Sequence, residues 1–519
     1  MATTANRTPT SGGAVIAPTF EVRCPADGRV VATLPEMGKA NVALAAAELR
    51  AAQPEWEALG PDGRGKHLLN WLDWILDNEQ RILALVQAES GKSAGDTTIE
   101  TMVAVEVINY YVKNARKFLT DRSVRGHNPA ALAKSLRVFI RPQPLVGIIF
   151  PWNYPLGMPM MDVPPALAAG AAVLTKPSEF TPVAWTECVR GFREEIGAPP
   201  VIASITGGGE AGAAVVDEVD MITFTGSART GRKIAVRAAE RLIPCNLELG
   251  GKDPMIVLDD ANIDRAVNGA IWGGLFNAGQ ACISVERIYV QEPVYDEFVD
   301  KLTAKAGALR VGMDPAGSWQ NDFGALANDA QMDIVERHVQ DAIDKGASVT
   351  TGGQRDANGL FYPPTVLVDV DHTMACMREE TFGPTLPVMK VRSEEEAIRL
   401  ANDSQYGLSS SVWTSDPERA ERVGRCIEAG AVNINNAAAN AFQFPLPFGG
   451  WKESGTGSRF GGAAGMLKYC REQAYCSERF DLTSELHWYP YTKTKGELFN
   501  RAVRLLGARG LRRRLGLNG

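Results

Sequence analysis

The sequence predicts an α/β fold with two domains, each built on a mostly parallel sheet that helices cover on both faces. Three observations predict it. The chain has 519 residues, which is more than one hydrophobic core usually holds. Short apolar runs typical of buried strands alternate with helix-length segments in two successive stretches. The composition, 45% apolar and 22% charged, is that of a folded globular protein.

Long helical patterns fill the first third of the chain. Apolar residues recur at helical spacing over 39–59, 64–89 and 96–119. The segment 135–141 instead alternates apolar and polar side chains, as a strand with one covered face does. We therefore predict a helical layer followed by a projecting, bridging strand.

Two strand and helix alternations follow. In the first, strands are expected at 145–150, 171–175, 201–205, 220–224 and 245–249. Helices between them are expected at 157–169, 182–196, 210–217 and 227–240. In the second alternation, strands are expected near 254–258, 286–290, 365–368, 386–391 and 431–435. Each alternation predicts one doubly wound domain.

Charge, histidine and cysteine content exclude several functions. A net charge of -7 gives no general attraction to nucleic acid, and five scattered His predict no metal centre. The eight Cys form no CxxC pair, which favours a reducing, cytoplasmic compartment. Residues 1–18 lack the apolar run of a signal peptide and are expected to be a flexible arm. The apolar segment 142–175 contains seven prolines, too many for a membrane-spanning helix.

Three loops after predicted strands could meet a phosphate or a sugar. Gly-Gly-Gly-Glu-Ala-Gly at 207–212 matches the dinucleotide fingerprint, but it follows the third strand, and an ordinary glycine turn explains it equally well. Phe-Thr-Gly-Ser at 224–227 opens a helix whose N-terminal amides could bind a pyrophosphate, or Ser227 could simply cap that helix. Lys-Pro-Ser-Glu at 176–179 ends a strand at the edge where α/β sheets bind ligands, although a solvated loop has the same pattern.

Two residues could carry chemistry. Cys282 lies just past the predicted helix 263–277, in a turn of small residues that leaves room for a substrate. Most cysteines are nevertheless small buried hydrophobes. Glu248 ends an apolar strand, where it could act as a general base or simply be exposed.

Taken together and in order, these motifs resemble those of the aldehyde dehydrogenase superfamily over about residues 20–480. The matching segments are Pro151-Trp152-Asn153, 176–179, 224–227, Glu-Leu-Gly-Gly-Lys at 248–252, Gly-Gln-Ala-Cys at 279–282, Glu-Glu-Thr-Phe-Gly-Pro at 379–384 and Pro-Phe-Gly-Gly at 447–450.

The resemblance implies a domain layout. A Rossmann-like NAD-binding domain would comprise 19–125 and 145–252, and a catalytic domain would comprise 253–447. Segments 126–144 and 470–485 would supply bridging strands, and family members pair the last strand, here near 473–480, with a neighbouring subunit. A homodimer or homotetramer is therefore expected.

The resemblance also implies catalytic roles. Cys282 would attack the aldehyde as a thiolate, giving a thiohemiacetal and then a thioester. Asn153 and the backbone N–H of Cys282 would stabilise the oxyanion. Glu248 would activate the water that releases the acid, and its presence disfavours transfer to coenzyme A.

The implied cofactor is NAD, with NADP possible. Glu380 matches the family position at the nicotinamide ribose, with Phe382 beside the ring. Lys176 and Glu179 match the positions at the adenosine ribose, where a carboxylate repels a 2′-phosphate and favours NAD. The other expected cofactor contacts are Phe150, Pro151, Trp152, Ser178, Gly209, Phe224, Gly226, Ser227 and Gly250.

The implied substrate tunnel is apolar. Its expected lining residues are Met158, Met161, Ile283, Phe442 and Phe448. Many semialdehyde-specific members carry an Arg at the position of Met161, so we expect an aldehyde with an apolar aliphatic or aromatic tail. Succinic semialdehyde is the alternative, because segment 430–470 is similar to that of bacterial members assigned to it. A silent NAD-binding scaffold and a non-redox thiol esterase are alternatives of other classes, which the intact catalytic residues and cofactor motifs disfavour.

The C-terminal segment 486–519 departs from the family pattern. Residues 501–519 carry six Arg and no acid, interleaved with leucines. The segment could form an amphipathic basic helix that makes peripheral contact with anionic lipid. A helix that covers the protein's own acidic surface is the reading favoured by the sequence.

Overall fold

A computed structural model describes residues 18–127, 131, 133–315, 318–457, 460–480 and 483–517. The arm expected at 1–18 lies, apart from Pro18, outside the described residues. Contacts divide the chain into two units, one of Met1–Phe118 with Pro142–Tyr469 and one of Leu119–Arg141 with Cys470–Gly519. The bridging segment was expected at 126–144, and the corresponding segment of the smaller unit is Leu119–Arg141. It starts earlier because β3 (Arg122–Val124) pairs with β4 (Lys134–Pro142).

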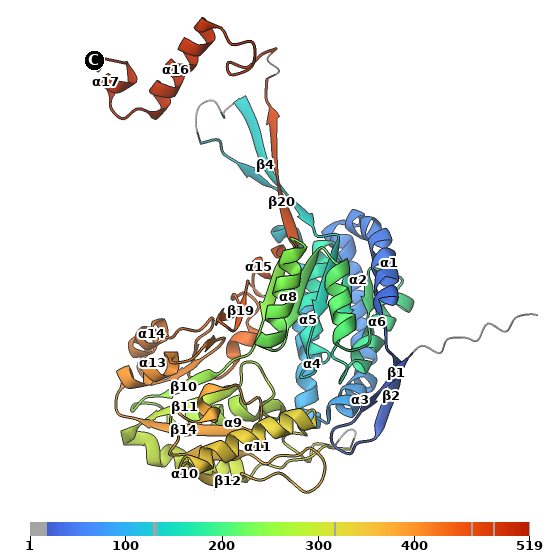
Figure 1. Cartoon of the computed structure of the whole chain (residues 1–519), viewed down its shortest axis with the longest axis vertical. Coiled ribbons are helices and arrows are strands. Elements are labelled where there is room, and N and C mark those ends of the chain that lie inside the picture. Colours follow the sequence, from blue (N-terminus) through green and yellow to red (C-terminus); the bar gives the residue numbers. More distant parts are fainter. Residues whose placement is uncertain are drawn as a thin grey trace, which may run out of the picture. The chain divides into compact units, whose positions relative to one another are not determined.

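The larger unit holds both predicted α/β layers (Figure 1). The first sheet has the order β19-β9-β8-β5-β6-β7, in which all pairs are parallel except β19 with β9. Its strands are β5 (Leu145–Ile149), β6 (Ala172–Lys176), β7 (Ile202–Ser204), β8 (Met221–Thr225), β9 (Cys245–Glu248) and β19 (Gly455–Thr456). The connecting helices are α5 (Gly157–Ala169), α6 (Val183–Glu194), α7 (Gly209–Glu218) and α8 (Ala228–Glu240). The strand order reverses between β5 and β8, and open α/β sheets bind ligands beyond the carboxyl ends of their strands at such a point.

The second sheet has the order β12-β13-β14-β11-β10-β16-β17 and is parallel except for β12. Its strands are β10 (Asp253–Val257), β11 (Val285–Gln291), β12 (Ser348–Thr351), β13 (Thr365–Val368), β14 (Thr385–Val391), β16 (Ser411–Trp413) and β17 (Asn433–Ile434). Its larger helices are α9 (Ile263–Leu275), α10 (Glu292–Gly307), α11 (Asp329–Asp344), α13 (Glu394–Asn402) and α14 (Pro417–Arg425). All five strands expected in this half are present, and β12 and β16 are additions.

The N-terminal helical layer consists of four helices, α1 (Lys39–Ala58), α2 (Gly60–Asp77), α3 (Glu79–Ser90) and α4 (Ala94–Phe118). The single helix expected over 64–89 was wrong, because the chain breaks at Asn78, where φ is -105° and ψ is 11°. The Asn78 side chain donates back to the Trp74 carbonyl and so ends α2. The hairpin of β1 (Thr19–Arg23) and β2 (Val30–Pro35) was not expected.

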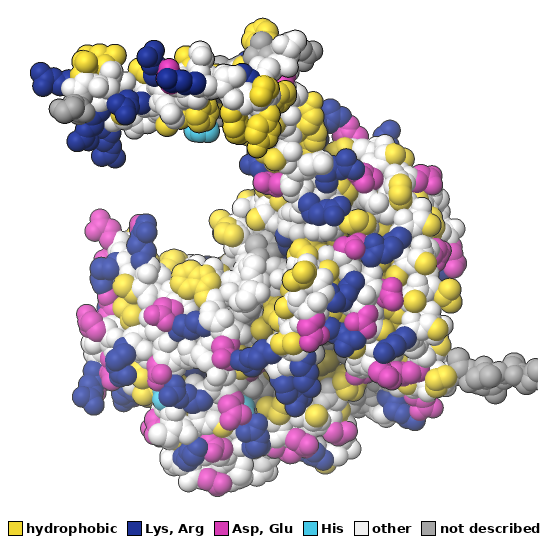
Figure 2. All heavy atoms as spheres, turned by 45° about the horizontal axis from the view of Figure 1, so that its top comes forward, with side chains coloured by type: hydrophobic (Ala, Val, Ile, Leu, Met, Phe, Trp, Pro, Cys, Tyr) yellow, Lys and Arg dark blue, Asp and Glu magenta, His cyan; other side chains and the backbone are white. Residues whose placement is uncertain are grey.

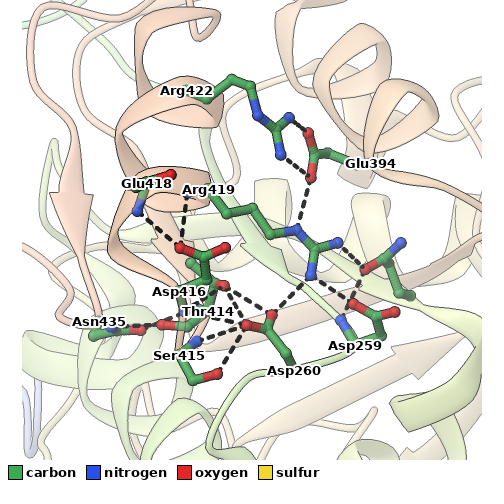
Figure 3. Close-up of polar contacts among 11 residues, drawn as sticks. Asp259, Asp260, Glu394, Thr414, Ser415, Asp416, Glu418, Arg419, Arg422 and Asn435 are labelled. Carbon is green, nitrogen blue, oxygen red and sulfur yellow. Dashed lines mark hydrogen bonds and ion pairs between the residues drawn. The ribbon is translucent and has the colours of Figure 1, made fainter.

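A charged cluster fastens α13 and α14 to the end of β10 (Figure 3). Arg419 Nη1 lies 2.6 Å from Asp259 Oδ1 and 2.9 Å from Asp260 Oδ1, and Arg419 Nε lies 2.8 Å from Glu394 Oε2. Arg422 also pairs with Glu394. One guanidinium therefore ties three elements of the second sheet together.

The smaller unit contains a three-stranded sheet of order β20-β4-β3, with β20 at Cys470–Glu478 rather than 473–480. It also contains α16 (Lys493–Gly507) and α17 (Leu511–Arg514). In the described part of the chain, no helix combines the length and apolar character needed to cross a membrane. The remaining short elements are η2 (Phe276–Gly279), α12 (Ala375–Arg378), β15 (Tyr406–Gly407), η3 (Ala439–Phe442), β18 (Trp451–Lys452) and α15 (Ala464–Leu467).

Candidate active site

Cys282 lies in a tight turn between η2 and β11. Asn277 and Ala278 have left-handed φ angles of 54° and 57°, which non-glycine residues rarely adopt. A Cβ at Gly279 would come within 2.2 Å of the Gly383 carbonyl oxygen, so only glycine fits there. The turn closes where Ser284 N donates to Ala281 O at 3.0 Å. Cys282 is half-buried and remains accessible.

Asn153 is joined to this turn by hydrogen bonds. Its Nδ2 donates to the Gln280 carbonyl at 3.0 Å, which leaves the second N–H of the amide available. Asn277 Nδ2 donates to the carbonyls of Asn153, at 2.9 Å, and Gln280, at 3.1 Å. The loop after β5 is thereby held beside the residues that precede Cys282.

Glu248 ends β9, and its side chain is only 2% exposed. The two glycines that follow it allow close approach. A Cβ at Gly251 would lie 2.4 Å from the Cys282 carbonyl oxygen, and a Cβ at Gly250 would lie 2.4 Å from Glu380 Oε2. The Glu-Leu-Gly-Gly segment therefore passes directly against the backbone of Cys282.

Glu380 is held beside the Gly250-Gly251 segment, close to the ion pair of Glu286 and Lys252. Its Oε1 accepts a hydrogen bond from Gly251 N at 2.9 Å. Burial, with repulsion from Glu286, raises the pKa of Glu380 to about 8. Glu286 accepts from the N–H groups of Thr381 and Phe382, both at 2.8 Å, and so holds the loop that carries Phe382. The Phe382 ring meets the Trp152 ring edge to face, with centroids 5.5 Å apart.

A cavity of about 900 Å³ lies at the carboxyl ends of β5, β6 and β8, where the strand order reverses. Of the thirteen expected cofactor residues, eight line it: Phe150, Pro151, Lys176, Ser178, Glu179, Gly209, Phe224 and Gly226. The other five, which are Trp152, Ser227, Gly250, Glu380 and Phe382, do not. Ser227 caps α8 by accepting from Thr230 N at 3.4 Å, as its simpler reading predicts.

This cavity fits a dinucleotide. Gly209 begins α7 with open space in front of its Cα, so a phosphate could approach the helix N-terminus. Lys176 Nζ pairs with Glu179 Oε2 at 3.1 Å on the wall, which offers both a cation and an acceptor for sugar hydroxyls. Sequence reasoning missed other lining residues, among them Gly208, Gly212, Thr230, Arg232, Lys233 and Arg237. The glycine-rich segment 207–212 was the available signal for the first two.

A second, smaller cavity of about 50 Å³ contains Cys282. All five expected tunnel residues line it, namely Met158, Met161, Ile283, Phe442 and Phe448. The lining residues that sequence reasoning missed are Ile99, Val103, Tyr154, Gly157, Phe276, Ala281, Ala441 and Phe460. Ile99 and Val103 lie one turn apart on α4, but helical spacing alone does not say which neighbour a face meets. No Lys, Arg, Asp or Glu is among the described residues that line this cavity.

A profile described as the aldehyde dehydrogenase family matches residues 15–475. The chain belongs to the aldehyde dehydrogenase family. This dehydrogenase is 38% identical to a 4,4′-diapolycopene aldehyde oxidase of Methylomonas sp, over 92% of the chain and 89% of the relative. It is 37% identical to a protein of Mycobacterium ulcerans named as a succinate-semialdehyde dehydrogenase [NADP(+)], over 87% of each chain.

Solved structures agree with this assignment. Betaine aldehyde dehydrogenase from Staphylococcus aureus, in complex with NAD+, superimposes with a TM-score of 0.85 at 30% identity, over 91% of this chain and 96% of that one. The predicted α/β fold and the predicted family are therefore confirmed. The dehydrogenase oxidises an aldehyde to an acid with NAD(P).

Proposed function

We propose that this aldehyde dehydrogenase acts on an aldehyde with an apolar aliphatic or aromatic tail and releases the free acid. The observation that supports this proposal is the cavity beside Cys282. Methionine, phenylalanine and isoleucine side chains line it, and none of its described lining residues is charged. An apolar tail is favoured there, whereas a distal carboxylate would be buried without a cation.

Catalysis would begin at Cys282. Its thiolate attacks the aldehyde carbon, and the carbonyl oxygen becomes an oxyanion. The free N–H of the Asn153 amide and the backbone N–H of Cys282 would donate to that oxygen. Asn277 supports this arrangement because it bonds both the Asn153 backbone and the Gln280 backbone.

The residues of the 900 Å³ cavity fit NAD(P), which when bound supplies the hydride acceptor for this reaction. Lys176, Glu179 and the N-terminus of α7 would hold its adenosine and phosphate portions. Glu248 would then remove a proton from the water that attacks the Cys282 thioester, regenerating the thiol and releasing the acid. Glu248→Gln should give one equivalent of NADH per site and then stall.

Cofactor preference is proposed to favour NAD. Glu179, on the wall beside Lys176, would repel a 2′-phosphate. Arg232, Lys233 and Arg237 line the same cavity, so Glu179→Gln should raise kcat/KM for NADP while changing that for NAD little. A wild-type kcat/KM for NADP above that for NAD would contradict the preference.

Succinic semialdehyde is the second candidate, and the name of the Mycobacterium ulcerans relative favours it. NADH release should be measured with octanal, benzaldehyde and succinic semialdehyde. We expect kcat/KM for the apolar aldehydes to exceed that for the semialdehyde by at least ~100-fold, because burying an unpaired carboxylate costs several kcal/mol. Met161→Arg should reduce this difference in kcat/KM. A clear wild-type advantage for succinic semialdehyde would overturn the proposal, and activity in Cys282→Ala would overturn the mechanism.

A further inference from the structure

The helix α16 is amphipathic, and no residue of it is buried. Leu498, Ala502 and Leu505 follow one another at helical spacing, and Phe499, Val503 and Leu506 lie beside them. Leu498 is 55% exposed, Phe499 44% and Val503 54%. Arg501 and Arg504 lie on the other side of the helix, with Glu497 and Asn500. The chain thus presents a continuous apolar face bordered by cations.

The segments on either side of α16 have matching character. Before it, Trp488, Tyr489 and Tyr491 are 52%, 80% and 69% exposed. After it, Leu511, Leu515 and Leu517 are also exposed around the run Arg512-Arg513-Arg514. Figure 2 shows yellow and dark blue side chains side by side along this C-terminal extension. Tryptophan and tyrosine are the residues enriched where membranes meet water.

Charge is divided sharply along the chain. Residues 486–519 contain eight Lys and Arg against one Glu, which gives +7 in a chain whose total is -7. Residues 1–485 therefore carry -14. The acidic body would be repelled from an anionic surface, so a cationic extension would have to supply any attraction to one.

We propose that residues 486–517 bind peripherally to the surface of an anionic lipid membrane. Leu498, Phe499 and Val503 would enter the boundary between headgroups and acyl chains, while the arginines would contact lipid phosphates. A 15-residue helix is too short to span the bilayer, so α16 would lie in its plane. The Trp and Tyr residues that precede α16 favour a membrane interface over the use favoured by the sequence, in which the helix covers the protein's own acidic surface. Docking does not depend on which aldehyde the enzyme oxidises.

The test is co-sedimentation of the full chain with vesicles. We expect binding to phosphatidylglycerol–phosphatidylcholine vesicles and little binding to phosphatidylcholine alone. The triple change Arg512→Gln, Arg513→Gln and Arg514→Gln should weaken binding about 100-fold, which follows from roughly fivefold per cation lost. The matched control changes Arg116, Arg399 and Arg425 to Gln, since these are 76%, 65% and 77% exposed elsewhere on the surface. It alters net charge equally and should leave binding within about twofold.

Apolar variants separate insertion from simple charge attraction. Leu498→Ser with Leu505→Ser should also abolish most binding, whereas Leu44→Ser with Leu76→Ser, at positions that are 72% and 42% exposed, should not. Octanal turnover in solution should be unchanged in all four variants. Equal sedimentation with both vesicle types, or equal losses in test and control variants, would overturn the proposal. The proposal would also be overturned if the wild type bound no vesicles and the extension variants differed from it in molecular mass. The apolar face of α16 would then cover a second copy of the chain.

Discussion

At the residue scale, the site depends on a few side chains held by backbone contacts. Asn153 is the clearest case, because its amide bonds the Gln280 carbonyl next to the Cys282 turn. Asn153→Ala should lower kcat/KM by ~100- to 1000-fold, as loss of one oxyanion donor typically does. The measurement is steady-state NADH release, with titration of the Cys282 thiol to show that the nucleophile is intact.

The control for this change is Asn268→Ala, at an exposed position of α9, where the amide oxygen accepts a hydrogen bond from Lys305 Nζ at 2.6 Å. It should leave kcat/KM unchanged. If Asn153→Ala retained full turnover, or lost it only because the protein unfolded at a lower temperature, Asn153 would have no part in stabilising the oxyanion.

Some residues of the site could be predicted from the sequence, and others could not. The motifs around Cys282, Glu248 and Asn153 are local, so their spacing could be read directly. Tyr154, Phe276 and Phe460 could not be found in this way, because they meet at the Cys282 cavity from separate parts of the chain. Their place in the cavity depends on tertiary packing, which the spacing of residues along one element does not reveal.

At the element scale, the Arg419 cluster holds α13 and α14 against β10. The side chains of Arg419 and Glu394 are 19% and 9% exposed, so Arg419→Ala leaves a mostly buried carboxylate that keeps, among the described residues, Arg422 as its ion-pair partner. We expect it to destabilise the protein by about 2 kcal/mol, the size typical of lost charged hydrogen bonds. Thermal unfolding measures this.

Arg425→Ala is the matched control for Arg419→Ala. Arg425 is 77% exposed and pairs with Glu421 one turn away on the same helix, an arrangement that contributes about 0.3–0.5 kcal/mol. Equal stability losses in the two variants would show that the Arg419 cluster contributes no more to stability than an exposed ion pair does.

Glu89 links α3 to the N-terminus of α6. Its oxygens accept from Val183 N at 2.6 Å and Ala184 N at 3.1 Å. Burial nevertheless raises the pKa of Glu89 from 4.5 to about 8. The folded state therefore favours the neutral acid, and the stability that this provides is complete below pH 4.5 and is lost as pH rises to about 8.

Glu89→Gln removes this titration while keeping one acceptor. Between pH 5 and pH 8, the unfolding temperature of the wild type should fall by more than that of the variant. The pKa of Glu380 is also raised, but Glu380 is present in both proteins, so its effect on the pH dependence cancels when the two are compared. The control is Glu55→Gln, at an exposed position, and its unfolding temperature should change with pH as that of the wild type does. Parallel curves for wild type and Glu89→Gln would contradict the assignment.

The order of elements was predictable because apolar strands and helical faces have different periods. Two kinds of element were not. The break at Asn78 lacks glycine or proline, so the pattern over 64–89 looked continuous. Strands β12 and β16 read Ser-Val-Thr-Thr and Ser-Val-Trp, so they lack the apolar run by which the equally short β13, Thr-Val-Leu-Val, could be recognised.

At the scale of the whole molecule, the sequence predicts two sheets and a separate bridging strand, and the structure has both sheets and a smaller unit with β20 at the edge of its own sheet. An exposed nine-residue edge strand is open to pairing with another chain. Together with the family resemblance, this leads us to expect a homodimer or homotetramer assembled through β20.

Lysines on an edge strand oppose such pairing. Ala474→Lys with Cys476→Lys places two on one face of β20, where both residues are exposed. Light scattering without lipid should show a multiple of the 56.0 kDa chain mass for the wild type and a shift toward the monomer for the variant. Leu44→Lys, on the exposed face of α1, should leave the mass unchanged. A wild-type monomer at all concentrations, or an unchanged mass in the β20 variant, would mean that this edge faces solvent and that the two sheets complete the enzyme within one chain.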